Sequence, residues 1–193
     1  MKNFALLLII SLVSIFFGCE QSKSKIENKQ KFVAKEHPWV SDDTIESKEE
    51  MRFYILTKCL QEKFDAGRIE DAKDSIKELK LLLPKYSKNW NYGNATHKIN
   101  ITSGRIALRD KKIGQAKMFL IEAGKTQGSP QLNSFGPNMS LAKELLEKGE
   151  KKCVLDYLNL CRIFWESDFS KLGKWITDVE NDRIPDFGVN LIF

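Results

Sequence analysis

Apolar residues recur three or four positions apart through most of the chain beyond residue 50, and this spacing limits the fold more than any other feature. Between residues 51 and 64 the stripe consists of Phe53, Leu56, Leu60 and Phe64. Between residues 69 and 83 it consists of Ile69, Ala72, Ile76, Leu79 and Leu83. Residues at this spacing share one face of an α-helix. Because only Asp65-Ala66-Gly67-Arg68 separates the two stripes and Pro84 ends the second, we expect two antiparallel helices joined by a tight turn.

The same pattern predicts further helices at residues 89–109, 113–123, 138–148, 150–165 and 170–181. Short turns at Asp110-Lys111-Lys112 and at Gly149 join two more pairs of them. We expect residues 126–137 to form a non-helical loop and the apolar tail 184–193 to pack back on the helices. Residues 49–193 therefore predict one all-α domain that is large enough for a hydrophobic core.

Small residues fall at corresponding places in the three helix pairs. The first pair has Gly67, Ala72, Ile76 and Pro84, the second Gly104, Ala116, Leu120 and Ala123, and the third Ala142, Gly149, Leu158 and Cys161. Short side chains let two helices approach closely where they cross. In these positions residues 53–164 resemble the tetratricopeptide repeat, a unit of about 34 residues. The resemblance implies antiparallel helix hairpins that stack as a short right-handed solenoid.

The repeat pattern is irregular. Ala72, Ala116 and Val154 take equivalent places in the three pairs but lie 44 and 38 residues apart, because segments 85–96 and 126–137 are inserted. A helical bundle without repeats is the alternative. Residues 149–165, together with Ile184-Pro185-Asp186-Phe187-Gly188, also resemble a module of uncharacterised bacterial proteins, and that likeness implies no activity.

The first eighteen residues have the pattern of a secretory leader. Lys2 precedes the apolar run 4–17, which only Ser11 and Ser14 interrupt. Such a run is shorter than the roughly 20 apolar residues of a spanning helix. The following Ile15-Phe16-Phe17-Gly18-Cys19 resembles a lipobox, which implies that residues 1–18 are a lipoprotein signal peptide and that Cys19 receives a lipid. An uncleaved N-terminal anchor and an ordinary cleaved signal are the alternatives.

Residues 19–48 are polar and of mixed charge, which predicts a lipidated cysteine followed by a flexible tether. Several acyl chains on one residue hold a protein firmly to a bilayer. The first partner that we expect is therefore a membrane, reached through the lipid on Cys19. The expected location is the bacterial cell envelope, on the periplasmic or the outer face of a membrane.

The charge of the chain argues against a nucleic-acid partner. The sequence has 31 Lys and Arg against 26 Asp and Glu, a net charge of +5, which becomes +4 when Lys2 leaves with the leader. The lysines are spread through the expected helices among nearly as many acids, so they predict a solvated surface and not a basic stripe.

The three cysteines beyond Cys19 are expected to be small buried thiols, because each lies among apolar residues. Cys153 and Cys161 are eight residues apart, about 12 Å on one helix, which is too far for a disulfide. Cys59 pairing with one of them in an oxidising compartment is the alternative.

The chain lacks the patterns that usually carry chemistry. His37 and His97 are its only histidines, so they cannot form a multi-histidine metal centre. The sequence also has no Cys-x-x-Cys, no Gly-x-Ser-x-Gly and no phosphate-binding glycine loop. We therefore expect no catalytic residue, no metal and no cofactor.

The resemblance to the tetratricopeptide repeat also implies a concave groove lined by the first helix of each hairpin. The positions that match ligand-facing ones are Gln61, Lys98, Arg105 and Arg109. The last three are spaced seven and four residues apart, so they share one helix face, and a basic stripe there would suit an acidic peptide or a C-terminal carboxylate. Ordinary solvated cations are the alternative.

The segment 126–137 supplies two more candidates, because binding residues concentrate in long connections. Asn133 and Phe135 are expected to present a contact surface to a partner. Alternatively, Leu132 and Phe135 fill the groove between two hairpins and only support the fold.

The sequence as a whole predicts a membrane-anchored lipoprotein whose helical-repeat domain binds another protein or peptide, as an adaptor or an assembly subunit. It does not fix the identity of that partner or the oligomeric state. One alternative is an immunity or inhibitor lipoprotein that neutralises an envelope-targeting enzyme. Another is a hydrolase of envelope polymers.

Overall fold

The structure is a computed structural model that describes residues 45–165 and 169–192. The described residues contain eight α-helices and one 3-10 helix, and no strand. The all-α class that the apolar spacing predicts is thus confirmed for this part of the chain. The chain divides into two units, Met1–Met51 and Arg52–Phe193. The side-chain contacts described below lie within the second unit.

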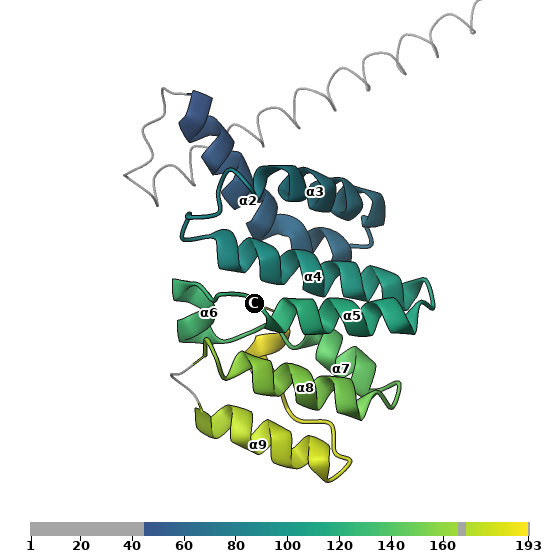
Figure 1. The fold of residues 1–193 in the computed structure, drawn as a ribbon. Helices are drawn as coiled ribbons and strands as arrows, with labels where there is room; N and C mark the ends of the chain where they lie inside the picture. The colour runs from purple at the N-terminus through teal and green to yellow at the C-terminus, as the bar shows by residue number, and fades with distance from the viewer. Residues whose placement is uncertain (1–44, 166–168, 193) are drawn as a thin grey trace, which may run out of the picture. The chain divides into compact units, whose positions relative to one another are not determined.

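The helices follow one another through this unit with short connections (Figure 1). Their bounds are α2 Ile45–Asp65, α3 Ile69–Leu82, α4 Tyr92–Arg109, α5 Ile113–Gly124, α6 Pro130–Phe135, α7 Ser140–Leu146, α8 Lys151–Cys161 and α9 Phe169–Glu180, followed by the 3-10 helix η2 Gly188–Leu191. Each helix that the sequence predicts is present, and α2 begins at Ile45, ahead of the predicted start at Met51.

The prediction of a non-helical loop at residues 126–137 was wrong for the six residues of α6. Ser129 is the N-cap of this helix, because its side-chain oxygen accepts a hydrogen bond from the backbone N–H of Leu132 at 3.0 Å. Pro130 occupies the first turn, where its missing N–H is not needed. Gly136 ends the helix with a φ of +86°. A helix this short has no apolar stripe, so only its capping residues could have predicted it.

The turns after α2, α4 and α7 share one backbone conformation. Their central residues are Gly67, Lys111 and Gly149, with φ angles of +73°, +60° and +80°. In each turn the residue after the central one donates a backbone hydrogen bond back across the helix end, from Arg68 to Lys63, from Lys112 to Ala107 and from Glu150 to Leu145. This is the Schellman arrangement, which satisfies the last carbonyl groups of a helix.

Glycines allow helices to cross closely at two places. A Cβ atom on Gly104 of α4 would lie 2.2 Å from Cδ2 of Leu141 in α7. A Cβ atom on Gly124 of α5 would lie 2.9 Å from Cβ of Leu160 in α8. Both distances are shorter than a normal carbon contact, so larger residues would push these helices apart.

The apolar stripes form two hydrophobic clusters, and α4 contributes to both. Phe53, Leu60 and Leu79 belong to the first cluster, with Ile99 of α4. Ala116, Leu120, Leu145, Val154 and Tyr157 belong to the second, with Ile101 of α4. No helix among the described residues is both long enough and apolar enough to cross a bilayer.

The tail packs back on the helices through some of its residues. The ring of Phe187 is buried and meets the ring of Trp175 edge to face at 5.0 Å. Asn190 is fully buried, and its side-chain amide donates to the carbonyl oxygens of Phe135 and Pro137 at 2.9 and 3.0 Å. Val189 and Ile192, by contrast, are 56% and 74% exposed.

Candidate binding cavity

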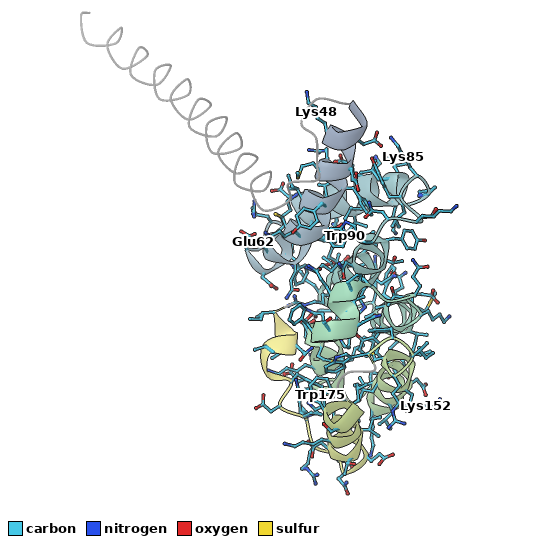
Figure 2. All side chains as sticks on the ribbon, turned by 90° about the vertical axis from the view of Figure 1, so that its left-hand side faces the viewer. Lys48, Glu62, Lys85, Trp90, Lys152 and Trp175 are labelled. Atoms are coloured by element: carbon cyan, nitrogen blue, oxygen red, sulfur yellow. The ribbon has the colours of Figure 1, made fainter. Side chains whose placement is uncertain are left out.

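A cavity of about 330 Å³ lies between α2, α4, α6 and the last described residue of the tail. Its lining residues are Tyr54, Thr57 and Lys58 from α2, Asn94, His97 and Lys98 from α4, Gln131, Leu132 and Phe135 from α6, and Asn91, Gly136, Asn138 and Ile192. This volume is at the lower end of the range for sites that bind small groups, roughly 300 to 1,000 Å³. Figure 2 looks onto α6, on the side of the unit where these elements meet.

Lys98 is the charged residue of the cavity that is most removed from water. Burial, followed by the positive charge of Lys58, lowers the pKa of Lys98 below its usual range, whereas Cys59 raises it. Among the described residues the Lys98 ammonium group has neither a hydrogen bond nor an ion pair. A half-buried cation without a counter-charge is unfavourable, and an anion beside it would relieve that cost.

Asn91 adds an unused hydrogen-bond donor. The residue is 2% exposed, and its side-chain oxygen accepts a hydrogen bond from Nδ2 of Asn94 at 3.1 Å. Its own Nδ2 atom is buried and has no hydrogen-bond partner among the described residues. Leaving a buried donor unpaired costs about 1 to 3 kcal/mol.

His97 is a structural part of the cavity wall. Its Nδ1 atom lies 3.0 Å from the carbonyl oxygen of Ala123, and its Nε2 atom accepts a hydrogen bond of 3.0 Å from the backbone N–H of Asn138. Because a carbonyl only accepts and a peptide N–H only donates, the ring is neutral with its proton on Nδ1. Burial lowers the pKa of His97 to about 4, against a weaker opposing effect of its bond to Ala123.

Apolar side chains border the cavity. Phe135 is 59% exposed and Ile192 is 74% exposed, although both line it. The ring of Tyr54, another lining residue, lies 5.7 Å from the ring of the half-exposed Trp90. Figure 2 shows Trp90 on the side that carries α6. The cavity thus combines polar groups inside with an apolar border, which is common in binding sites.

Two of the sequence-predicted partner-binding residues are used inside the fold. Gln61 is 9% exposed, donates to the carbonyl oxygen of Leu191 at 3.0 Å and accepts from Asn138 at 2.8 Å. The side chain of Arg105 is 14% exposed and forms ion pairs with Asp65 and Glu144 at 2.7 and 2.8 Å.

The other predicted residues lie on the surface or in the cavity. Lys98 and Phe135 both line the cavity. Asn133 is exposed but supports α6, because its Oδ1 atom accepts from the backbone N–H of Ser129 at 3.2 Å. Arg109 is exposed at the end of α4 and is not among the cavity residues. Cys19, the predicted lipidation site, lies outside the described residues.

Sequence reasoning missed most polar residues of the cavity, among them Tyr54, Lys58, Asn91 and Asn94. A signal for two of them was present, since Tyr54, Lys58 and Gln61 are spaced four and three residues apart and share a helix face. Asn91 and Asn94 carried no comparable signal, because their position depends on the α6 segment.

Two other chemical features bear on the site. The described residues contain no group of three or more His, Cys, Asp or Glu that could hold a metal ion. Cys59, Cys153 and Cys161 are free thiols, and burial raises the pKa of Cys153 and, more strongly, that of Cys161. The alternative of a disulfide from Cys59 is therefore not present in this structure.

Comparison of the chain with protein-family models, with curated proteins and with solved structures finds no match.

Proposed function

We propose that the chain is a lipoprotein of the bacterial cell envelope that binds another protein, and that its cavity holds an acidic group of that partner. The observation that carries the proposal is Lys98, a half-buried lysine that lines the cavity without a counter-charge. The exposed apolar residues Phe135 and Ile192, which also line the cavity, offer contacts to the rest of the partner.

A carboxylate is the group that best matches these donors. It carries a negative charge and only accepts hydrogen bonds, so it suits the ammonium groups of Lys58 and Lys98, which line the same cavity. Charge-assisted hydrogen bonds are about twice as strong as neutral ones and gain strength away from water. The apolar border formed by Phe135 and Ile192 would cover the neighbouring side chain of the partner. Either an acidic side chain or a chain end can supply the carboxylate.

A repeat architecture is part of this proposal. In its support, Ala72, Ala116 and Val154 are all fully buried, and each follows the central residue of an equivalent turn by five positions. We therefore propose that α2 with α3, α4 with α5, and α7 with α8 are hairpins of a short tetratricopeptide-like solenoid. In such an arrangement the first helices of successive hairpins line a common wall, which is consistent with α2 and α4 both contributing to the cavity.

The membrane anchor of the proposal depends on Gly18-Cys19 and is tested separately. In bacterial cells, the variant Cys19→Ser is expected to lose the lipid, remain unprocessed at Cys19 and change its distribution between membrane and soluble fractions. Mass spectrometry of the mature chain measures the lipid directly. A Cys19→Ser chain that is cut and retained in membranes like the parent chain contradicts the anchor.

Partner binding is tested by placing a photo-crosslinking amino acid at Phe135, at the border of the cavity, in the full chain in intact cells. We expect one dominant adduct, and we expect Lys98→Gln to reduce its yield at least tenfold. The matched control is Lys174→Gln, since Lys174 is an exposed lysine outside the cavity. Mass spectrometry of the adduct then shows whether an acidic side chain or a chain end lies beside position 135. An adduct that forms equally in Lys98→Gln contradicts the proposal.

A further inference from the structure

The end of α3 and the turns that follow it form a second unusual surface, which we call the α3 patch. It consists of Lys77, Lys80, Leu81, Lys85 and Lys88. All four lysines are exposed, and Leu81 is 74% exposed although it lies among them in the sequence. Figure 2 shows Lys85 at the end of the unit that carries α3.

Three of the four lysines in the α3 patch are not paired with an acid among the described residues. Glu78 is the one acidic residue between positions 77 and 88, and Arg52 binds it through two hydrogen bonds, one of 2.7 Å from Nη2 to Oε2. Lys77, Lys80 and Lys88 have no hydrogen bond or ion pair with any residue that the structure describes. The fourth lysine, Lys85, lies over the ring of Tyr86 at 5.5 Å.

Several other lysines of the unit are paired with acids. Lys73, Lys117 and Lys125 pair with Glu70, Glu150 and Glu122 at 2.8, 2.6 and 2.7 Å. Such pairs cancel charge locally and leave a solvated surface. In the α3 patch, Lys77, Lys80 and Lys88 have no such partner, so the electrostatic field of the patch favours an anionic surface.

We infer that the α3 patch contacts the headgroups of anionic phospholipids. A lysine can lay its aliphatic stem along an interface while its ammonium group reaches a phosphate, and a leucine between lysines can enter the apolar boundary. Each lysine near an anionic leaflet contributes roughly a fivefold gain in affinity. Contacts of this strength orient the domain on a bilayer to which the lipid already holds it. The inference rests on the proposed membrane anchor for its biological setting.

The test uses the full chain in lipid nanodiscs that contain either phosphatidylglycerol or phosphatidylcholine. A water-soluble acetylating reagent modifies exposed lysines, and mass spectrometry measures the rate at each one. We expect Lys77, Lys80 and Lys88 to react at least fivefold more slowly in the anionic discs. About 1 M salt should remove this difference, because it shortens the screening length to about 3 Å. Lys148 and Lys174, exposed lysines outside the α3 patch, are internal controls that should react equally in both discs.

Several outcomes would overturn the inference. One is an equal rate at the patch lysines in the two kinds of disc, and another is equal protection of Lys148 and Lys174. Protection by short duplex DNA as strong as that by anionic discs would assign the α3 patch to nucleic acid. Leu81→Ser should weaken the protection while all the charges remain, and no change would exclude the leucine from the contact.

Failure of the inference can be told apart from failure of the proposed function. The double variant Lys77→Gln with Lys80→Gln should reduce the protection of Lys88 from acetylation in the anionic discs. It should leave the yield of the adduct at position 135 unchanged. A chain that does not stay with the discs contradicts the lipid anchor. In that case, the rates at Lys77 and Lys80 with and without added phosphatidylglycerol vesicles decide whether the α3 patch binds lipid.

Discussion

Gln61 of α2 and Asn138 ahead of α7 lie 77 residues apart in the sequence and are joined by a buried hydrogen bond of 2.8 Å from Nδ2 of Asn138 to Oε1 of Gln61. Asn138 also accepts a hydrogen bond at its carbonyl oxygen from the hydroxyl of Tyr157 at 2.9 Å, and its backbone N–H donates to His97. The segment between α6 and α7 is thus held from α2, α4 and α8 by polar contacts.

The contact between Gln61 and Asn138 should couple the two residues in stability. We expect Gln61→Leu and Asn138→Leu each to lower the free energy of unfolding by about 2 kcal/mol, because each leaves a buried partner unpaired. The double variant should lose at least about 1 kcal/mol less than the sum of the two, as residues in direct contact usually do. Urea unfolding of the full chain measures the three values. The exposed pair of Glu122 and Lys125 is the control, with an expected coupling below about 1 kcal/mol. Strictly additive losses at Gln61 and Asn138 would contradict the prediction.

Neutral His97 should make the stability of the domain depend on pH. Its pKa is about 4 in the folded chain against 6.5 for the ordinary group, so between these values the unfolded chain binds a proton that the folded chain excludes. Stability therefore falls as pH decreases from about 6.5 to about 4, by roughly 3 kcal/mol in all from this residue, and the contribution is fully present above pH 6.5. Urea unfolding at a series of pH values measures the slope.

The variant His97→Gln serves as the control for this dependence. It is expected to be less stable at neutral pH, because it cannot reproduce both hydrogen bonds to Ala123 and Asn138. Between pH 6.5 and 4 the variant should lose only the stability that the titration of carboxylates costs both chains. It should lack the additional loss that His97 causes in the parent chain. If the two chains lose stability in parallel over this range, His97 is not the group that titrates.

The helices were predictable from the sequence because each has a stripe of residues that pack locally. Phe53, Leu60 and Leu79 are all fully buried, as their spacing predicts. The α6 helix was missed because it depends on the capping residues Ser129 and Pro130 and not on periodicity. The functional residues were harder to predict. Contacts between segments that are distant in the sequence decide which polar side chains stay without a partner.

Lys98 and Arg105 illustrate this limit. Both were predicted as partner-binding residues from the same helix face, seven residues apart. Arg105 pairs with Asp65 and Glu144, which lie 40 and 39 residues away in the sequence, whereas no acid pairs with Lys98 among the described residues. Helix spacing identifies residues that share a face, but it contains no information about the acids on neighbouring helices.

Arg105 and Arg109, one helical turn apart, should therefore respond differently to substitution. Arg105→Ala removes two ion pairs and the contact of the guanidinium group with the ring of Phe64 at 4.4 Å, and we expect a loss of about 2 kcal/mol of stability. Arg109→Ala should change stability by less than about 0.5 kcal/mol, since Arg109 is exposed.

Loss of Arg105 should also change the titration of Glu144. Burial raises the pKa of Glu144 and Arg105 opposes that rise, so Arg105→Ala should raise the pKa of Glu144 further. NMR titration of the carboxyl group measures this shift. A variant with an unchanged pKa for Glu144 would show that the ion pair does not form in solution.

Gly93 connects the fold to the cavity through a close backbone contact. A Cβ atom at Gly93 would lie 1.8 Å from the carbonyl oxygen of Gly128, so the N-terminal turn of α4 and the segment before α6 touch without room for a side chain. Gly93→Ala must displace this segment, and we expect a loss of about 2 kcal/mol or more. Gly114→Ala is the matched control, because nothing lies within 4 Å of its Cβ position and the change should stabilise α5 by about 0.5 to 1 kcal/mol.

Since the displaced segment leads directly into α6, Gly93→Ala should also reduce the yield of the photo-crosslinked adduct at position 135, whereas Gly114→Ala should leave that yield unchanged. Equal adduct yields in a folded Gly93→Ala chain would show that the position of α6 does not control access to Lys98.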